Sequence, residues 1–454
     1  MRLRRRVPRP TAGVLVSLEA AGHPAYLVGG CVRDILQGRP PLDWDIATGA
    51  LPEQVMHLFE RTVPTGLKYG TVTVIQSGVP IQVTTFRSET GYQDHRRPEG
   101  VTFIPDLQAD LSRRDFTINA MALDARGCLY DPLGGRDDLR RRLVRAVGDP
   151  RRRFDEDGLR LLRGVRLVAE LGFELEAETG RAMGEKAHLL DHIAPERIGA
   201  ELARIVQSAH PGKGLVLLER TGLLDRFLPE LRAGVGLIQN EHHVFTVWEH
   251  TVLAVEHVPP DLTLRLAALL HDVAKPYTLT VGDDGRRHFF GHELLGADMA
   301  EEILTRLRFG RPVVDRVRHL VRQHMALHHA PDMKEAAVRR LLARIGQDAI
   351  KPLLQLRQAD RLASGTKQGP VSEGTARLLG RMERILAGDS ALALRDLAVD
   401  GHDVQRVTGL PPGPAVGRIL RRLLDAVLEE PALNRRQCLE DLARRLAADE
   451  DGRV

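Results

Sequence analysis

The sequence predicts an α+β fold for about the first 150 residues, followed by a mostly helical chain up to residue 454. Two patterns lead to this prediction. Short runs rich in β-branched residues alternate with helical stretches in the first part, and apolar residues from 155 onward recur at the 3.6-residue period of a helix. The composition agrees, because aromatic residues make up only 4% of the chain while leucine, alanine and valine dominate, which favours helices packed on helices.

The first part contains several candidate strands and two candidate helical stretches. The expected strands are residues 25–28, 44–47, 71–75 and 81–86, and the expected helical stretches are 32–36 and 52–60. The segment 88–105 is polar and contains glycines and prolines, so we expect a long loop there. Loops of such length are usually functional or disordered.

The helical part has candidate boundaries of its own. Pro211 with Gly212 and the segment 380–390 are expected to be joints, and the Gly-Asp-Asp-Gly run 282–285 is expected to be a turn. Together with the motifs described below, these features divide the chain into a head (1–150), a helical neck (151–212), a helical body (213–375) and a helical tail (376–454).

Charge and cysteine usage narrow the classes of partner and compartment. The formal net charge is only +4, yet arginines crowd into one stretch, at positions 136, 140, 141, 142, 145, 151, 152, 153, 160, 163 and 166. This local basic stripe favours a polyanionic partner, although a run of arginines is also typical of a solvated face. Three cysteines without metal-ligand spacing, and no apolar run of about 18 residues, favour a cytoplasmic protein without a membrane span.

A pair of glycines follows the first expected strand. Gly29 and Gly30 separate that strand from a helical stretch that carries Arg33 in its first turn. Such a turn lets backbone N–H groups approach a triphosphate closely, and the start of a helix adds positive potential. An ordinary tight turn is the plainer interpretation of two glycines taken alone.

Two aspartates come next, at the start of the second expected strand. Asp43 and Asp45 are two positions apart, and in a strand such residues point to the same face. Their carboxylates would then stand side by side and share Mg²⁺, which neutralises a triphosphate and activates the attacking 3′ hydroxyl in phosphoryl transfer. A glycine turn, a helix and a strand with paired acids together form the layout of polymerase-β-like nucleotidyltransferases.

Five segments, in order, resemble the class II tRNA nucleotidyltransferases and the related bacterial poly(A) polymerases. They are residues 27–48, 82–87, 113–122, 156–163 and 196–198. The resemblance implies a polymerase-β-like catalytic head with Asp43 and Asp45 as catalytic metal ligands. It also implies that the nucleotide is held by Gly29, Gly30, Arg33, Arg114, Asp157, Arg160, Arg163 and Arg166. For Arg163 and Arg166, ordinary salt bridges on a helix are the alternative.

Asp157 and Arg160 have the chemistry needed to choose a base. They are three positions apart on an expected helix, so they would lie on one face. The carboxylate accepts hydrogen bonds and the guanidinium donates them, which matches the donor-beside-acceptor edge of both cytosine and adenine. Uracil and guanine present the reverse pattern and would leave buried polar groups unpaired, at a cost of about 1–3 kcal/mol each.

One position departs from the related enzymes. Gln82 stands where relatives often have a glutamate, a third carboxylate near the metals. An amide binds Mg²⁺ more weakly than a carboxylate. Either the enzyme works with two acids or another carboxylate, of which Glu89 is the nearest in the sequence, takes this place.

A second set of residues predicts a metal site in the helical body. His250, the pair His271–Asp272, and the distant Asp360 resemble the pattern of the HD phosphohydrolase superfamily. Imidazole and carboxylate ligands suit Mn²⁺, Fe²⁺, Ni²⁺, Co²⁺ or Zn²⁺. His292 and His324 are candidates for a second metal, and a surface or capping role is the alternative for each histidine alone. The resemblance implies hydrolysis of 2′,3′-cyclic phosphates or, alternatively, a relic that only binds tRNA.

The tail and the implied partners complete the expectation. Residues 399–404 and 409–417 resemble the tail of bacterial tRNA nucleotidyltransferases, which implies contact with the elbow of tRNA as well as its 3′ end. The implied substrates are CTP and ATP. The sequence leaves the oligomeric state open.

Several activities remain open within this resemblance. They are complete CCA addition, A addition alone, CC addition alone, poly(A) synthesis, and an HD phosphohydrolase with a nucleotide-sensing head. The segment 88–110 carries Tyr92, Asp94, Arg96 and Pro98 and has full length, whereas CC-adding enzymes tend to lack this loop, so A addition is favoured. The presence of both Asp43 and Asp45 argues against the sensing head.

Overall fold

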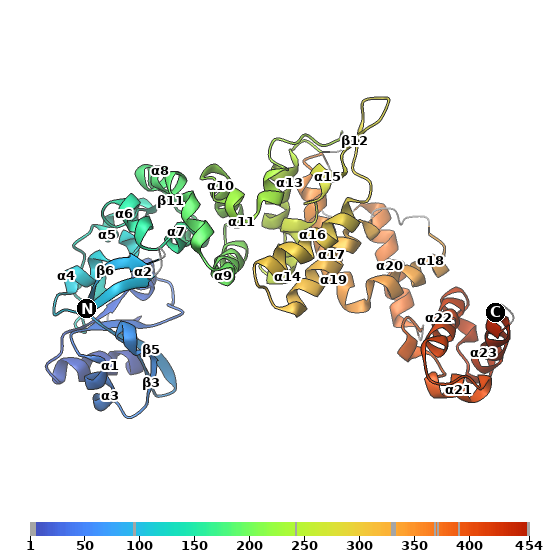
Figure 1. Ribbon diagram of the computed structural model, residues 1–454, viewed down its shortest axis with the longest axis horizontal. Coiled ribbons are helices and arrows are strands. Elements are labelled where there is room, and N and C mark those ends of the chain that lie inside the picture. The colour runs from blue at the N-terminus through green and yellow to red at the C-terminus, as the bar shows by residue number, and fades with distance from the viewer. Residues whose placement is uncertain are drawn as a thin grey trace. The chain divides into compact units, whose positions relative to one another are not determined.

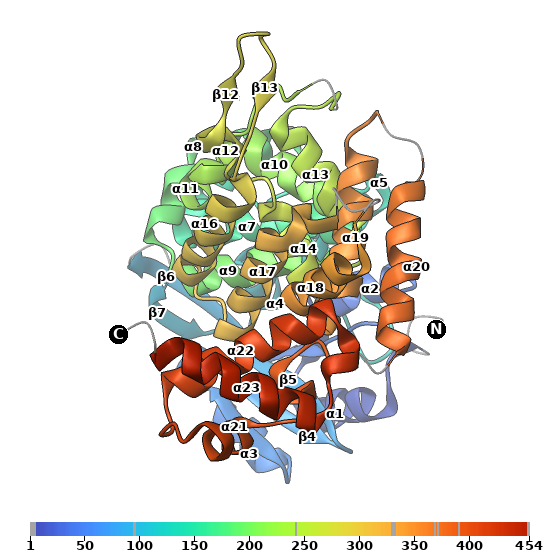
Figure 2. The same ribbon diagram turned by 90° about the vertical axis from the view of Figure 1, so that its right-hand side faces the viewer.

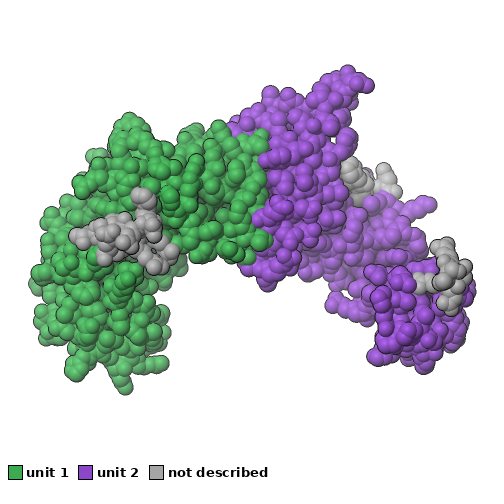
Figure 3. Space-filling view, viewed as in Figure 1, with its two compact units in different colours: residues 1–233, 303–309 green, residues 234–302, 310–454 purple. Residues whose placement is uncertain are grey.

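A computed structural model describes residues 6–93, 97–240, 243–327, 333–366, 369, 372–388 and 391–451 of the chain. The chain folds into two compact units, coloured separately in Figure 3. Unit 1 contains residues 1–233 and 303–309, and unit 2 contains residues 234–302 and 310–454. In the part of the chain that the structure describes, no helix has the length and apolar character needed to span a membrane.

Unit 1 begins with a mixed sheet of seven strands, which lies among the blue elements of Figure 1. The strand order is β3-β4-β5-β2-β1-β8-β9, and only the β2–β5 pair is parallel within this sheet. The strands are β1 (Ala25–Val28), β2 (Asp45–Thr48), β3 (Thr62–Gly66), β4 (Thr71–Gln76), β5 (Val79–Thr85), β8 (Ala122–Leu123) and β9 (Leu129–Tyr130). The four strands and two helices expected in this part are present, with ends that differ by a few residues.

The core of this sheet explains why the strands form. Alternate residues of β4 and β5, such as Val72, Val74, Ile81 and Val83, are fully buried, as the period of two in a strand requires. Helices α1 (Arg9–Ala20) and α3 (Pro52–Leu58) contact β4 and β5 and cover this apolar face. Helix α2 (Gly30–Gln37) contributes Val32 and its neighbours to the same core.

The prediction of a loop at residues 88–105 is wrong for most of that segment. Residues 87–93 and 97–103 form an antiparallel hairpin of β6 (Arg87–Gln93) and β7 (Arg97–Phe103), separate from the main sheet. A two-stranded ribbon outside the sheet need not bury one face, so its strands lack the apolar alternation that predicts them. Asp94 and Arg96 lie outside the described residues.

The rest of unit 1 is mostly helical, as expected, with one short parallel pair of β10 (Leu143–Val144) and β11 (Glu174–Leu175). Its helices are α4 (Leu107–Ser112), α5 (Gly135–Arg141), α6 (Pro150–Glu156), α7 (Leu159–Leu171), α8 (Ala177–Glu185), α9 (Pro195–Val206), α10 (Pro211–Arg220), α11 (Leu224–Phe227) and α12 (Pro229–Arg232). Helix α7 is central, because it contacts α6, α9 and α10 and is buried along almost its entire length. A new helix begins at Pro211, and the division between the two units falls after Ala233.

Unit 2 is helical and contains one small hairpin, which projects at β12 in Figure 1 and is seen from another side in Figure 2. The hairpin pairs β12 (Thr280–Val281) with β13 (Arg287–His288) around the turn expected at 282–285. The main helices are α13 (Val247–His257), α14 (Leu262–Leu270), α16 (His292–Arg306), α17 (Arg311–Gln323), α18 (Glu335–Ile345), α19 (Gln347–Ala363), α20 (Glu373–Ala387), α21 (Gly401–Thr408), α22 (Pro414–Glu429) and α23 (Arg436–Asp451).

The joint expected at 380–390 is wrong for residues 380–387, because α20 continues to Ala387. Leu378, Met382 and Ile385 are buried at helical spacing, and this apolar stripe outweighs the glycine at 380. Residues 391–451 then form a small core of their own between α21, α22 and α23, which includes Ile419, Leu423 and Leu439.

Candidate active site and candidate metal centre

The glycine turn of the head is built for close approach. Strand β1 ends at Val28, Gly29 has a positive φ of 77°, and α2 begins at Gly30. A Cβ atom at Gly29 would lie 3.2 Å from a guanidinium nitrogen of Arg114 and 3.6 Å from Oδ2 of Asp45. The backbone angle therefore requires glycine, a side chain would also press on the end of Arg114, and the turn brings these two charged groups together.

The two aspartates of the head, called the acid pair below, lie beside this turn. Strand β2 begins only at Asp45, and Asp43 lies in a bend before it, so the expectation that both stand in one strand is wrong for Asp43. Asp43 is exposed and Asp45 is partly buried. Burial raises the pKa of Asp45, Arg114 acts against this shift, and the nearby charge of Asp43 raises that pKa further.

The acid pair fits a bound divalent cation. Two carboxylates within electrostatic range of one another, one of them partly desolvated, are mutually destabilising unless a cation lies between them. Oxygen ligands from one or two carboxylates, completed by water and substrate phosphates, are typical of Mg²⁺ sites.

Gln82 lies next to the acid pair. It is the partner of Asp45 in the parallel register of β2 and β5, and its side chain is exposed. The side chain of Glu89 lies outside what the structure describes. Among the described residues, the position beside Asp45 on the neighbouring strand is therefore an amide.

A chain of hydrogen bonds joins two of the predicted arginines. Arg33 donates to the side-chain oxygen of Asn119 at 2.9 Å, and Asn119 donates to Oδ1 of Asp115 at 3.4 Å. Arg163 donates to Oδ2 of Asp115 at 2.8 Å through Nε. Burial would raise the pKa of Asp115, but Arg163 outweighs it and holds that pKa well below its ordinary value.

Asp157 and Arg160 occupy a different local structure from the one expected. Asp157 has extended backbone angles and precedes α7, so the expectation that both lie on one helix is wrong for Asp157. Its Oδ1 accepts from the backbone N–H of Leu159 at 3.0 Å, and Arg197 donates to its Oδ2 at 3.4 Å. Arg160 lies in the first turn of α7 and donates to the backbone carbonyls of Arg153 and Arg113 at 3.0 and 3.1 Å.

The other two predicted arginines differ in their surroundings. Arg114 is partly buried, pairs with Asp110 at 3.3 Å, and faces the Gly29 turn. Arg166 is only 6% exposed and donates from Nη1 to both carboxylate oxygens of Glu201 on α9, each at 2.9 Å. This ion pair joins α7 to α9. In this structure Arg166 therefore makes the salt bridge that was the alternative to nucleotide binding.

In unit 2, four predicted residues come together from distant parts of the sequence. His250 lies on α13, His271 and Asp272 follow α14, and Asp360 lies on α19. Nε2 of His250 is 3.2 Å from Nε2 of His271, 3.4 Å from Asp272 and 3.3 Å from Asp360. Metal–ligand bonds of about 2.0–2.2 Å place neighbouring ligand atoms about 3.0–3.5 Å apart, so this set fits one ion.

Two more histidines extend the set on the other side of Asp272. Nε2 of His292 lies 3.2 Å from Nε2 of His324, and these atoms are 3.4 and 3.9 Å from Oδ1 of Asp272. Asp272 thus faces one group with Oδ2 and the other with Oδ1. We call these six side chains the histidine–aspartate cluster: His250, His271, Asp272, His292, His324 and Asp360.

The ring orientation in this cluster favours metal binding. Nδ1 of His271, His292 and His324 lies 2.6–2.8 Å from a backbone carbonyl three residues earlier. A carbonyl only accepts, so each Nδ1 carries the proton and each Nε2 presents a lone pair in the neutral ring. The lone pairs of His292 and His324 face each other at 3.2 Å, which is stable with a cation between them.

Charges within the cluster are strongly coupled. Burial alone would raise the pKa of Asp272, but His271 and Lys275 outweigh burial and hold it well below the ordinary value. His243 lies beside the cluster with His250 and Asp360, and burial, together with Lys275, lowers its pKa to about 3. The sequence analysis missed His243, because it lies outside any helix and only the fold brings it to α13 and α19.

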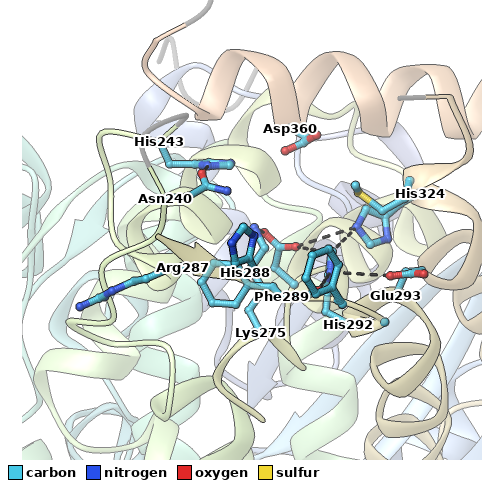
Figure 4. A pocket seen from close by; sticks show the side chains of 14 residues that line it. Asn240, His243, Lys275, Arg287, His288, Phe289, His292, Glu293, His324 and Asp360 are labelled. Atoms are coloured by element: carbon cyan, nitrogen blue, oxygen red, sulfur yellow. Dashed lines mark hydrogen bonds and ion pairs between the residues drawn. The ribbon is translucent and has the colours of Figure 1, made fainter. Parts of the chain in front are cut away.

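A pocket of about 470 Å³ opens over the histidine–aspartate cluster. Figure 4 shows His292 and His324 turned toward one another, with His288 and Phe289 in front and Arg287 at one side. The pocket wall combines four residues of the cluster with Lys275, Arg287 and two adjacent phenylalanines; the four are Asp272, His292, His324 and Asp360. The floor is therefore rich in metal ligands, and one side carries cations and aromatic rings.

Three families match consecutive parts of the chain. Residues 25–145 match the poly A polymerase head domain, residues 172–234 match a probable RNA and SrmB-binding site of polymerase A, and residues 240–365 match the HD domain. Together with the fold, these matches define a nucleotidyltransferase head and RNA-binding region joined to an HD domain, which confirms the resemblance.

Full-length relatives define the family more closely. The chain is 36% identical to a CCA-adding enzyme of Geobacillus stearothermophilus over 94% of both chains, and 32% identical to one of Lactiplantibacillus plantarum over 96% of this chain and 95% of that relative. A crystal structure of the Bacillus stearothermophilus CCA-adding enzyme in complex with CTP matches with a TM-score of 0.72 and 30% identity, covering 98% of each chain. The chain belongs to the family of CCA-adding enzymes, which are nucleotidyltransferases.

Proposed function

We propose that this protein adds C and A nucleotides from CTP and ATP to the 3′ end of tRNA without a template. The observation that carries the proposal is the similarity to CCA-adding enzymes over nearly the whole chain, at 36% identity for the Geobacillus relative. The Bacillus stearothermophilus relative was solved with CTP, which agrees with this substrate. The cytoplasm is the compartment we propose, in keeping with three cysteines that are all free.

The geometry of the head suits phosphoryl transfer. The 3′ oxygen of the RNA forms a bond to the α-phosphorus of the nucleotide, the bond to the β-phosphate breaks, and pyrophosphate leaves. Asp43 and Asp45 would hold Mg²⁺, which neutralises phosphate charge and activates the 3′ hydroxyl when bound. The turn at Gly29 and Gly30 has no side chain to keep phosphates away from its backbone N–H groups, and Arg33 and Arg114 supply positive charge beside it.

Base selection falls to the start of α7. The backbone carbonyls of Arg153 and Arg113 hold the guanidinium of Arg160, so that group is positioned before a nucleotide arrives. Asp157 raises the pKa of Arg163 after the larger effect of Asp115, which places these charges within electrostatic range. We propose that Asp157 and Arg160 read the base, Arg163 supports them, and Arg166 acts through its pair with Glu201.

The base-reading role has a direct test. Asp157→Ala is expected to lower kcat/KM for CTP and ATP by about 5- to 150-fold, as loss of about 1–3 kcal/mol from one buried hydrogen-bonding group implies. The ratio of kcat/KM for CTP and ATP to that for UTP and GTP should fall in the same variant. Unchanged discrimination by this variant would remove Asp157 from the base site.

Incorporation on three transcripts tests the main activity and separates it from its variants. Transcripts ending at the discriminator base, at C and at CC are incubated with labelled CTP, ATP or both. CCA addition to the first transcript supports the complete activity, whereas a single A on the third alone indicates an A-adding enzyme. Addition of CC alone would contradict the A addition inferred from the segment 88–110. Addition of a long A tail would indicate a poly(A) polymerase.

The domain roles are part of the same proposal. We propose a catalytic head at 1–150, a base-reading neck at 151–212, a body at 213–375, and a tail at 376–454 that contacts the tRNA elbow. Residues 391–451 have a core of their own, so truncation removes this core together with the contacts that α22 makes with α18. Truncation after residue 388 is expected to weaken tRNA binding and spare CTP binding, and unchanged tRNA affinity would refute the role of the tail.

The histidine–aspartate cluster favours a second activity. Six buried or nearly buried ligand side chains around a shared carboxylate form a centre for Mn²⁺, Ni²⁺, Co²⁺, Fe²⁺ or Zn²⁺. We propose a phosphohydrolase that opens 2′,3′-cyclic phosphates at RNA ends, where water adds to phosphorus and one ribose oxygen leaves. A metal would supply a nucleophilic hydroxide when bound.

Phosphodiesterase assays on 2′,3′-cyclic AMP test this activity. The wild type, loaded with Ni²⁺ or Mn²⁺, is expected to hydrolyse the ester, and His271→Ala is expected to lose that activity. The acid pair variant Asp45→Asn is the matched control and should retain it. An absence of hydrolysis with every metal would refute the proposed phosphohydrolase activity and leave the cluster with a structural role.

A further inference from the structure

We infer that the pocket over the histidine–aspartate cluster binds a nucleotide, with the phosphate at the cluster and the base stacked on Phe290. The inference rests on the proposed phosphohydrolase centre and names Phe290 and His288 as the residues that select its substrate class. That class is a phosphate ester carrying a flat heterocyclic base, either free or at the end of an RNA.

Phe290 is an unusual side chain for its position. It is 78% exposed although it is large and apolar, and it lines the pocket. The ring of His288 lies parallel to it, with ring centroids 5.2 Å apart and an interplanar angle of 8°. His288 therefore fixes Phe290 from one side and leaves its other face available, which is the arrangement of a base-stacking platform.

The neighbouring phenylalanine provides a contrast within the same loop. Phe289 is buried, and the ammonium of Lys275 lies 5.6 Å from its ring centroid. Lys275 also donates to Gln239 and pairs with Asp272, each at 2.6 Å. Phe289 is thus buried against Lys275, whereas Phe290 is exposed and is not needed for the packing of this loop.

The remaining walls of the pocket suit a phosphate. The cluster offers metal ligands, and Lys275 and Arg287 add two cationic side chains to the same lining. A volume of about 470 Å³ falls within the range of about 300–1,000 Å³ that is typical of small-ligand sites. One exposed phenylalanine beside cations and candidate metal ligands matches a phosphate ester that carries a flat base better than an apolar peptide, which would need a wider apolar surface.

A tryptophan placed at the platform reports binding at this pocket when its quenching is compared with that of the wild type and of a control variant, because the native Trp44 lies between Asp43 and Asp45 in the head. In Phe290→Trp, adenosine 3′-monophosphate with Mn²⁺ is expected to quench the added fluorescence relative to the wild type, whose two tryptophans are both buried. Inorganic phosphate should bind without quenching. Val281→Trp is the matched control, because Val281 is also exposed on β12 but does not line the pocket.

Truncation of the ring tests its contribution to substrate recognition. Phe290→Ala is expected to raise KM for 2′,3′-cyclic AMP about 5- to 150-fold, the range that corresponds to about 1–3 kcal/mol per stacked base, with kcat little changed. Phe290→Tyr should restore the KM. Mn²⁺ binding measured by calorimetry should be equal in all three proteins, which excludes damage to the cluster.

The outcomes separate this inference from the activity on which it rests. Quenching by adenosine 3′-monophosphate without any hydrolysis would support the platform and refute the phosphohydrolase. Hydrolysis that is unaffected by Phe290→Ala, together with no quenching in Phe290→Trp, would overturn the platform. A short RNA with a 2′,3′-cyclic end is compared with the free nucleotide, and the lower KM identifies the natural source of the base.

Discussion

The two candidate centres of this chain are built in opposite ways. The acid pair in unit 1 has two carboxylates, one exposed and one partly buried, with an amide at the neighbouring strand position. The histidine–aspartate cluster in unit 2 has six ligand side chains, whose Nε2 atoms and carboxylates converge within a few ångströms of each other.

This difference indicates when each metal site becomes complete. Mg²⁺ keeps several waters and is usually bound by one or two carboxylates together with substrate phosphates, so the acid pair becomes a full site only with a nucleotide. The cluster already provides enough nitrogen and oxygen ligands for a transition metal. We therefore expect metal binding to depend on substrate in unit 1 and to be independent of it in unit 2.

Of the proposed changes, removing one charge from the acid pair is expected to have the largest effect, and it acts on nucleotide incorporation. Asp45→Asn is expected to reduce nucleotide incorporation by at least about 1,000-fold, because stabilisation of transferring phosphate by metal is worth several kcal/mol. Incorporation of labelled CTP into tRNA measures it. Glu53→Gln, at an exposed acid on α3, is the control and should retain activity.

Full activity in Asp45→Asn would remove it from the catalytic machinery. Loss of Mn²⁺ binding to unit 2 in the same variant would contradict the independence of the two centres.

Metal binding to the cluster should stabilise unit 2 without any nucleotide. After chelation, Ni²⁺ or Mn²⁺ at 100 times its Kd is expected to add about 2.7 kcal/mol, which raises the unfolding temperature by about 5–10 °C. Differential scanning calorimetry measures the shift. His271→Ala should abolish it, whereas His402→Ala, at an exposed histidine of α21, should retain it.

A shift of equal size in His271→Ala would mean that the stabilising ion binds elsewhere. A shift that appears only after CTP is added would reverse the comparison between the centres.

The carboxylates of unit 1 also differ in how they contribute to stability. Asp115 is buried against Arg163, and its pKa is lowered well below the ordinary value. A lowered folded-state pKa means that the stabilisation is complete above the unfolded value of about 3.9 and is lost as the pH falls toward the folded value. Asp115→Asn is thus expected to lower the free energy of unfolding by about 1–3 kcal/mol at pH 7.

Urea unfolding at pH 7, 5 and 3 measures this contribution. The difference between the wild type and Asp115→Asn should persist at pH 5 and shrink toward pH 3. Asp137→Asn, which removes the exposed partner of Arg140, should cause no measurable change. A difference for Asp115→Asn that grows as the pH falls would contradict the direction of the pKa shift.

Regular periodicity explains what the sequence predicts well. The strands at Ala25–Val28 and Val79–Thr85 agree closely with expectation, because each buries apolar residues, and the chain after residue 155 is mostly helical, as its apolar period predicts. The β6–β7 hairpin escapes prediction, since a ribbon outside the main sheet has no such face.

Contacts between distant segments escape prediction unless a family pattern supplies them, as it does for His250 and Asp360. The pairing of Arg166 with Glu201 spans 35 positions, and His243 approaches Asp360 across more than a hundred. Asp157 is a different case, because its carboxylate hydrogen-bonds the N–H of Leu159 and the helix begins later than apolar spacing alone indicates.

The smallest expected effect is on the Mg²⁺ requirement of the head, when the amide beside the acid pair is replaced by a carboxylate. Gln82 is the register partner of Asp45, and its side chain is exposed. In Gln82→Glu a third carboxylate adds a ligand of the type Mg²⁺ prefers, and the Mg²⁺ concentration for half-maximal incorporation is expected to fall a few-fold. Gln54→Glu, at an exposed position of helix α3 outside the sheet, is the matched control. A fall in Gln82→Glu alone would mean that the head works with two acids and gains from a third, whereas an unchanged Mg²⁺ requirement would mean that a carboxylate from another segment already fills that place.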